Sequence, residues 1–156
     1  MTTSAAPSPE QAREIVDAVV GEVWRTYVGL EVEPAAAPGP DPDQSISGLV
    51  EIHGVWNLLL VVTCPSELAR QAGAALLGVE PSTPGELMDM LGEVTNITGG
   101  NLVGMLPGLP TMSVPTVEPG PGPAAAGGGD PLLFTYACGD QTFTVALIPT
   151  DTTEDR

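Results

Sequence analysis

Two polar residues of the segment 83–106, Glu93 and Asn96, stand three positions apart, the spacing of neighbours on one face of a helix. Asp89 and Gly100 extend this face by roughly one turn in each direction. A carboxylate can pair with a cation on another molecule, and an uncharged amide can hold a water molecule without competing for its proton. We call Asp89, Glu93, Asn96 and Gly100 the polar stripe and expect it to orient a water or bind a cationic partner. The alternative interpretation is a solvated helix face with incidental acidic residues.

The residues needed for covalent catalysis do not accompany the polar stripe. The chain has one histidine, His53, which is expected in a turn with a structural or solvent-facing role. Cys64 and Cys138 are isolated near the ends of strand-like segments. We expect both as buried apolar residues, although one disulfide between them can form in principle. The stripe therefore offers no Ser–His or Cys–His pair, and we predict no metal site.

A long helix is predicted to carry the stripe. Thr83 is a suitable N-cap, Pro84 fits the first helical position, and Glu86 would complete a capping box. The helix is expected to continue to about Leu106 and to stop before Pro107. Its opposite face can pack on a sheet, because it carries apolar residues at helical spacing: Leu87, Leu91, Val94, Leu102 and Met105.

Two glycines near the end of this helix weaken it. Gly99 and Gly100 each cost about 1 kcal/mol relative to Ala. Close approach by another molecule would explain that cost, because glycine leaves the helix surface open. We therefore expect a partner to contact the helix at Gly100.

Caps, apolar periodicity and turn residues predict the other elements. One helix is capped by Ser8 and Gln11 and stops at Gly29, and a second is capped by Ser66 and stops at Gly78. Strands are expected over residues 46–52, 56–63, 112–117, 132–138 and 142–148.

The element order predicts an α+β fold, with one largely antiparallel sheet and helices packed on it. The first two strands and the last two are each joined by a short turn, so each pair is expected to form an antiparallel hairpin. The predicted division of the chain is a disordered N-terminus (1–8), a single domain (9–149) with a loop (33–43) and a flexible Gly/Pro loop (118–131), and a polar tail (150–156).

The charge balance excludes two classes of partner. The chain has 20 acidic and 4 basic residues, a net charge of −16, and no lysine. It therefore cannot form the basic patch that nucleic acid or an anionic membrane surface requires. No targeting segment is visible, and the longest apolar run, residues 58–62, is too short to span a bilayer. We expect a cytoplasmic protein that binds neither nucleic acid nor membrane.

Residues 89–101 resemble the signature helix of the CheX branch of the CheC/CheX/FliY phosphatases. That signature is an acidic residue or Ser, three residues, Glu, two residues, Asn and a later Pro, matched here by Asp89, Glu93 and Asn96. The Gly-Asn pair common in CheX-like members is matched by Gly100 and Asn101. There is one Glu-x-x-Asn site, as in CheX, rather than the two of many CheC proteins.

A proline follows the signature helix in this family, and two prolines of the chain compete for that place. Pro119 fits the usual spacing, whereas Pro115 fits the local sequence, because residues 113–117 resemble the strand that follows the family's helix. We favour Pro115. The resemblance also includes the hairpin after Ile52 and the helix 67–77, and spans about residues 10–149.

The resemblance implies a phosphatase for the aspartyl-phosphate of a CheY-like response-regulator receiver domain. Asn96 would position the attacking water, and Glu93 would contact a lysine of the receiver. Asp89, Gly100, Asn101 and Pro115 would bind the partner. The family needs no cofactor of its own, since Mg²⁺ is bound by the receiver, and its members often form homodimers through their sheets. The alternatives are a non-catalytic module that docks a receiver or signalling protein, and a structural protein that retains only the fold.

Overall fold

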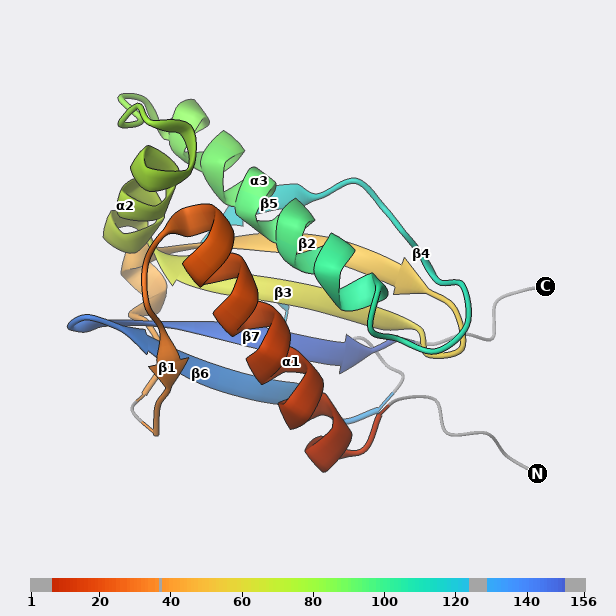
Figure 1. Cartoon of the computed structure of the whole chain (residues 1–156). Coiled ribbons are helices and arrows are strands. Elements are labelled where there is room, and N and C mark those ends of the chain that lie inside the picture. The colour runs from red at the N-terminus through yellow and green to blue at the C-terminus, as the bar shows by residue number, and fades with distance from the viewer. Residues whose placement is uncertain (1–6, 37, 124–128, 151–156) are drawn as a thin grey trace.

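An antiparallel sheet runs through the molecule and carries the helices on one face. The computed structural model of the chain describes residues 7–36, 38–123 and 129–150. The strand order is β1-β6-β7-β3-β2-β4, and β5 pairs with β2 along the same edge as β4. The helices α1 and α3 lie side by side across the sheet, and α2 packs beside the start of α3 (Figure 1). The predicted α+β class, with helices packed on an antiparallel sheet, is confirmed.

The described elements have the following bounds. The helices are α1 (Pro9–Val23), α2 (Ser66–Leu77) and α3 (Pro84–Val103), with a π-helical turn (Trp24–Val28) after α1 and a 3₁₀ turn (Pro42–Gln44) before β2. The strands are β1 (Glu33–Pro34), β2 (Ser45–His53), β3 (Leu58–Pro65), β4 (Thr111–Met112), β5 (Thr116–Pro119), β6 (Leu132–Cys138) and β7 (Gln141–Pro149).

Both predicted hairpins form. In the first, β2 and β3 pair from Ser45 with Pro65 to Ile52 with Leu58. In the second, β6 and β7 pair up to the Cys138–Gln141 pair. The pairing of β3 with β7 joins the two hairpins into one sheet.

The main core lies between this sheet and the helices. It consists of aliphatic residues from β2, β3 and β7 together with the buried faces of α1, α2 and α3. Trp24 stacks on Phe143 at 4.5 Å between ring centroids, and Tyr136 stacks on the same ring at 5.5 Å. The Tyr136 hydroxyl donates to Asp17 of α1 at 2.6 Å. These contacts attach α1 to β6 and β7.

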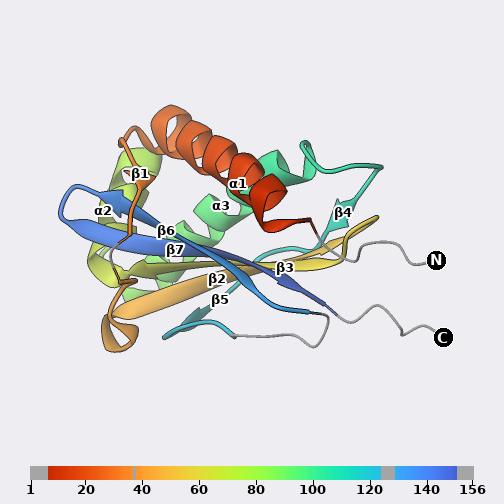
Figure 2. The same cartoon turned by 90° about the horizontal axis from the view of Figure 1, so that it is seen from below.

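The opposite face of the sheet carries a smaller apolar cluster of Val61, Ala146 and Ile148. The chain leaving β5 passes under this face (Figure 2). Gly122 lies against Val61 so closely that a Cβ atom there would stand 2.5 Å from the valine side chain. A hollow of about 360 Å³ remains beside this contact and is lined largely by prolines and β7.

The ends of the first two predicted helices agree with the structure at three of four places. Gln11 and Ser8 form the expected capping box, with hydrogen bonds of 2.9 and 3.2 Å. Gly29 and Gly78 end their helices with left-handed φ angles of 83° and 75°. The predicted Ser66 cap is wrong, because Ser66 is already helical and Pro65, which has no side-chain acceptor, holds the cap position.

Other boundaries also differ from the prediction: the strand expected over 56–63 is β3, Leu58–Pro65, and the helix expected to reach Leu106 ends at Val103. The expected strand 112–117 is broken into β4 and β5, and the loop 33–43 contains β1 and begins the 3₁₀ turn. Pairing with β2 continues through Pro119, so the chain leaves the sheet at Gly120 rather than at residue 118. Parts of the predicted N-terminus, flexible loop and tail, residues 1–6, 124–128 and 151–156, lie outside the described residues. Within the described ranges, no helix is both long and apolar enough to cross a bilayer.

Candidate functional site

The N-terminus of α3 is fixed by Ser82 and Thr83. The Thr83 hydroxyl accepts from the Glu86 N–H at 3.1 Å, as predicted for an N-cap. The Glu86 carboxylate, however, accepts hydrogen bonds from the N–H and hydroxyl of Ser82 at 2.8 and 3.0 Å. The predicted capping box, in which this carboxylate would accept from the Thr83 N–H, is therefore wrong. These two donors hold the pKa of Glu86 below its ordinary value, because they favour the charged carboxylate.

The inner face of α3 packs on the sheet as its periodicity predicts. Leu87, Leu91, Val94 and Leu102 are buried. The prediction that Met105 packs on the sheet is wrong, because α3 ends at Val103 and leaves Met105 49% exposed.

Two buried threonines lie on the same inner face. Thr95 and Thr98 each donate their hydroxyl to the carbonyl four residues earlier, at 2.7 Å. Their polar atoms are therefore satisfied inside the helix, and α3 can be buried along its length without an unpaired hydroxyl at these positions.

Two glycines explain how closely α3 approaches its neighbours. A Cβ atom on Gly48 of β2 would overlap the Thr95 hydroxyl, and one on Gly99 would stand 3.1 Å from the sulfur of Met112. Gly99 therefore packs against Met112 and Val50 inside the protein, and does not face an external molecule as expected. Gly100 has open space around its Cα. Of the two glycines, only Gly100 remains available to a partner.

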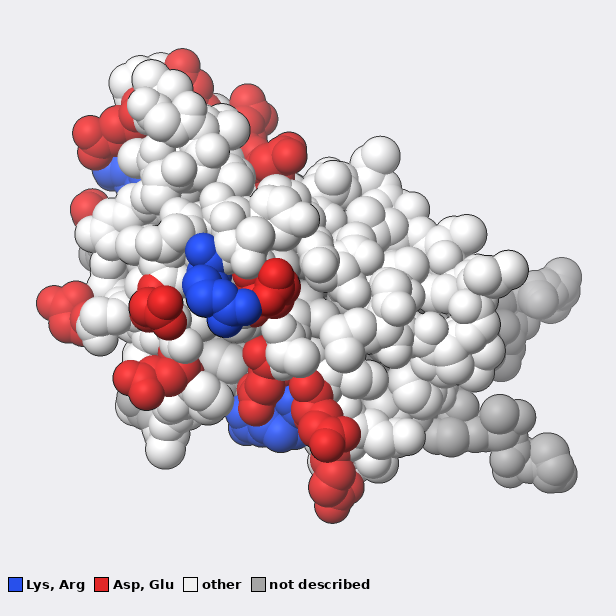
Figure 3. Space-filling view, in the orientation of Figure 1, with Lys and Arg blue, Asp and Glu red and all other residues white. Residues whose placement is uncertain are grey.

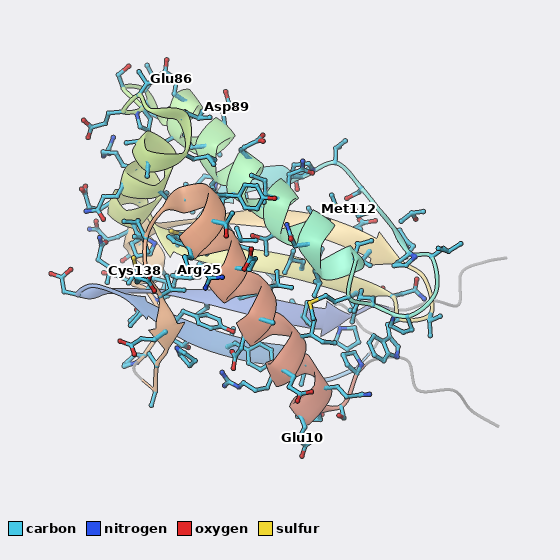
Figure 4. The ribbon with its side chains drawn as sticks, in the orientation of Figure 1. Glu10, Arg25, Glu86, Asp89, Met112 and Cys138 are labelled. Carbon is cyan, nitrogen blue, oxygen red and sulfur yellow. The ribbon has the colours of Figure 1, made fainter. Side chains whose placement is uncertain are left out.

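The polar stripe faces outward from α3. Asp89 and Glu93 are exposed and Asn96 is half-buried. Figure 4 shows Asp89 and Glu86 projecting from the N-terminal half of α3, away from the sheet. Beside the stripe is an open groove of about 510 Å³, lined by Met88, Asp89, Gly92, Glu93, Asn96, Val114, Pro115 and Val117.

A bulge between β4 and β5 forms the second wall of this groove. Between the pairs Ile52–Met112 and Leu49–Thr116, β2 has two residues whereas the facing segment, 113–115, has three. One extra residue bends such an edge away from regular pairing. The Ser113 hydroxyl substitutes for a backbone acceptor, since it receives the Glu51 N–H at 3.0 Å. The broken strand thereby brings Val114 and Pro115 to the side of α3.

The structure brings four of the six predicted site residues together. Asp89, Glu93, Asn96 and Pro115 line the same groove. Gly100 lies one turn beyond it on α3. Asn101 does not line it, and its amide donates to the Ile97 carbonyl of its own helix at 2.9 Å.

Of the two competing prolines, Pro115 lies at the groove. Pro119 pairs with Ile46 near the far end of β2. Val114 also lines the groove, and the sequence does not predict this, because a regular strand over 112–117 gives no signal for the bulge that exposes it.

The acidic side chains of the groove are free of internal partners in the part of the chain described. The ion pairs found there involve Asp17, Glu22, Glu51 and Glu67, and neither Asp89 nor Glu93. Acidic side chains lie over α2, the start of α3 and α1, whereas the far end of α3 is uncharged in the same view (Figure 3). The groove therefore lies where an acidic surface meets an uncharged one.

No group for covalent or metal chemistry accompanies the groove. Across the described ranges, no three His, Cys, Asp or Glu side chains gather in a way that could hold a metal ion. Cys64 is buried, and burial raises the pKa of its thiol. Cys138 is half-buried, and burial raises the pKa of its thiol too. Both cysteines are free thiols. His53 is exposed at the end of β2, 3.3 Å from the Glu51 carboxylate. The groove offers carboxylates, one amide and apolar side chains, which suit positioning and docking.

Comparison with known proteins places this arrangement in a family. The sequence model of the chemotaxis phosphatase CheX matches residues 46–130, which include β2 from its second residue, β3, α2, α3 and the bulge. No curated protein sequence matches the chain.

Solved structures of the family share the fold. A chemotaxis protein CheX from Vibrio vulnificus has a TM-score of 0.74 at 21% identity, covering 92% of this chain and 99% of its own. A CheX from Desulfovibrio desulfuricans has a TM-score of 0.72 at 23% identity, with 90% and 99% covered. A Borrelia burgdorferi structure, described as a complex of CheX with CheY, BeF3 and Mg, has a TM-score of 0.70 at 18% identity, with 89% and 97% covered. From the match over residues 46–130, the chain belongs to the CheX family of chemotaxis phosphatases.

Proposed function

We propose that this protein hydrolyses the aspartyl-phosphate of a CheY-like response-regulator receiver domain. The observation that carries the proposal is the position of Glu93 and Asn96, which project from one face of α3 into the same open groove. Neither is used to hold the fold together: Glu93 has no ion pair among the described residues, and Asn96 is only half-buried.

In the proposed reaction, Asn96 holds the attacking water in line with phosphorus. Its amide can accept a hydrogen bond from the water and donate one to a phosphoryl oxygen. Phosphoryl transfer depends mainly on positioning and on charge stabilisation, and needs little covalent chemistry from the protein. This fits a groove that contains an amide and carboxylates but no nucleophile.

Glu93 and Asp89 serve binding in this proposal. Glu93 pairs with a lysine of the receiver beside the phosphorylated aspartate, and this pair sets the position of α3 over the phosphoryl group. The negative surface around it favours a cationic partner and raises the rate of encounter. Mg²⁺ is held by the receiver, where it neutralises charge on the phosphoryl oxygens, so this chain needs no cofactor of its own.

The Borrelia burgdorferi complex supports the choice of partner, because a related CheX is found there with CheY, BeF3 and Mg. A receiver partner also favours a cytoplasmic location. The homodimer implied by the resemblance stays a prediction, and sedimentation of the purified protein tests it.

The test is to incubate the purified protein with phosphorylated receiver domains from the same genome and follow loss of the acyl phosphate. The proposal predicts that at least one receiver loses its phosphoryl group faster in proportion to added protein. Tight binding with no increase in rate would overturn the enzymatic proposal and favour a docking module. Binding that is unchanged by substituting Glu93 and Asn96 would favour a structural protein that only retains the fold.

A further inference from the structure

Val114 is an exposed apolar side chain that lies in the same groove as the polar stripe. It is 79% exposed, yet it lines the groove opposite Asp89, Glu93 and Asn96. Exposure of a valine at this level contributes little to folding, because the hydrophobic gain follows the area removed from water. Other apolar side chains of the chain, such as Val79 and Leu109, are also exposed, but neither lines the groove. The position of Val114 in the groove therefore distinguishes it from them.

The position of Val114 is fixed by its neighbours. The Ser113 hydroxyl donates to the Val114 carbonyl at 3.0 Å and accepts from the Glu51 N–H at 3.0 Å. The Ser113 N–H donates to the Glu51 carbonyl at 2.9 Å. Pro115, which follows, has a restricted φ angle. The bulge thus holds Val114 outward from β2 on a segment anchored by three hydrogen bonds.

The two walls of the groove differ in chemistry. One wall, on α3, carries the carboxylates of Asp89 and Glu93, and the other, on the bulge, presents Val114. A partner seated over Asn96 meets both walls at once. Its complementary surface needs a cationic group on the α3 side and an apolar patch on the bulge side, since carboxylates pair with cations and an exposed valine gains free energy when an apolar surface removes it from water.

We propose that Val114 is a docking and specificity residue for the phosphorylated receiver, and that it contacts an apolar patch next to the receiver's phosphorylated aspartate. This inference rests on the proposed function. It adds that two features of the receiver are recognised, a cation and an apolar patch, which lie on opposite sides of the phosphoryl group. Val114 takes no part in the chemical step. Its removal affects binding, and leaves the rate of the bound complex unchanged.

The test compares Val114→Ser with Val79→Ser. Val79 is a suitable control because it is also an exposed valine, 64% exposed, and it lies outside the groove, in the turn between α2 and α3. For each variant, the Kd for a receiver carrying beryllofluoride and Mg²⁺ is measured, together with KM and kcat for loss of the acyl phosphate. We expect Val114→Ser to raise Kd and KM about tenfold with kcat within about twofold of wild type, and Val79→Ser to change neither.

Two more variants separate docking from a structural effect. Val114→Ile keeps the apolar surface and is expected to retain wild-type affinity. Ser113→Ala removes the anchor of the bulge and is expected to raise KM while leaving kcat unchanged. Thermal unfolding of each variant shows whether the fold is retained, and Val114→Ser is expected to unfold at the wild-type temperature because the side chain is exposed.

The outcomes separate this inference from the proposed function. Equal Kd values for wild type and Val114→Ser would overturn the inference even if the wild type is an active phosphatase. A wild type that binds the receiver without hydrolysing it would overturn the phosphatase proposal, and the Kd comparison would still decide the role of Val114. A wild type that binds no phosphorylated receiver would overturn both.

Discussion

Gly48 of β2 lies directly beneath Thr95 of α3, so closely that a methyl group on Gly48 would overlap the threonine hydroxyl. Thr95 is fully buried and its hydroxyl is bonded to the Leu91 carbonyl. The next residue along the helix is Asn96, which lines the groove. The contact between Gly48 and Thr95 therefore sets both the height of α3 above the sheet and the direction in which the Asn96 amide projects.

Gly48→Ala is expected to destabilise the protein by about 1–3 kcal/mol, because the added methyl group overpacks the contact between α3 and β2. Equilibrium denaturation measures this change. The double variant Gly48→Ala/Thr95→Ala, which removes the opposing hydroxyl, is expected to unfold at a higher denaturant concentration than Gly48→Ala/Thr98→Ala, which leaves it in place. Wild-type stability of Gly48→Ala alone would show that the helix is not seated on this contact.

Gly100→Ala is expected to stabilise the protein by about 0.5–1 kcal/mol, because alanine favours a helix and the site is open. Gly21→Ala on α1, which is equally open, should give a similar gain. A large side chain at the two positions should affect receiver binding differently. Gly100→Leu is expected to weaken receiver binding, since the side chain would project from the polar stripe, whereas Gly21→Leu should not. Equal binding by Gly100→Leu and wild type would remove Gly100 from the predicted contact surface.

Much of α3 is predictable from the sequence because its signals are local. The cap at Thr83, the proline at the first position and the apolar residues at helical spacing depend only on neighbours within a few residues. The direction of the polar stripe follows from the same periodicity. The end of the helix is less predictable, because Met105 and Leu106 continue the apolar pattern after the helix has ended at Val103.

The second wall of the groove depends on contacts between segments far apart in sequence. The bulge forms because the Ser113 hydroxyl bonds to the backbone of Glu51, which a strand pattern over 112–117 does not predict. The sequence pattern assigns Gly99 to partner approach, whereas in the structure Gly99 packs against Met112 of β4. In both cases, a residue's role depends on what packs against it, and single-sequence periodicity does not carry that information.

Glu86→Gln is expected to remove part of the pH dependence of stability. The pKa of Glu86 is lowered in the folded protein by its hydrogen bonds from Ser82. A group of this kind stabilises the fold above its unfolded pKa, and the stabilisation is lost as the pH falls through the lowered folded value. The stability difference between wild type and Glu86→Gln should therefore be largest near neutral pH and should shrink below about pH 4. Denaturant unfolding between about pH 3 and pH 7 tests this; a difference independent of pH would contradict it.

Glu93→Gln is expected to weaken receiver binding through loss of charge. At low ionic strength, Kd should rise about tenfold, and the difference from wild type should shrink as salt is added, because salt screens the ion pair with the receiver. Glu14→Gln, which removes a charge from α1 away from the groove, serves as the control. Equal effects of the two substitutions would indicate a general influence of net charge rather than a contact made by Glu93.

The most direct test of the proposed phosphatase activity uses the Asn96→Ala variant at a concentration that saturates the phosphorylated receiver. The quantity measured is the rate at which the bound receiver loses its phosphoryl group. We predict a loss in kcat on the order of 100-fold, with the Kd for the beryllofluoride-bound receiver within about twofold of wild type, because the amide positions the water and contributes little to docking. Asn96→Asp, which keeps the size of the side chain but replaces the amide with a charge, should be similarly slow. A kcat for Asn96→Ala equal to that of the wild type would contradict the assignment of the groove on α3 as the site of hydrolysis.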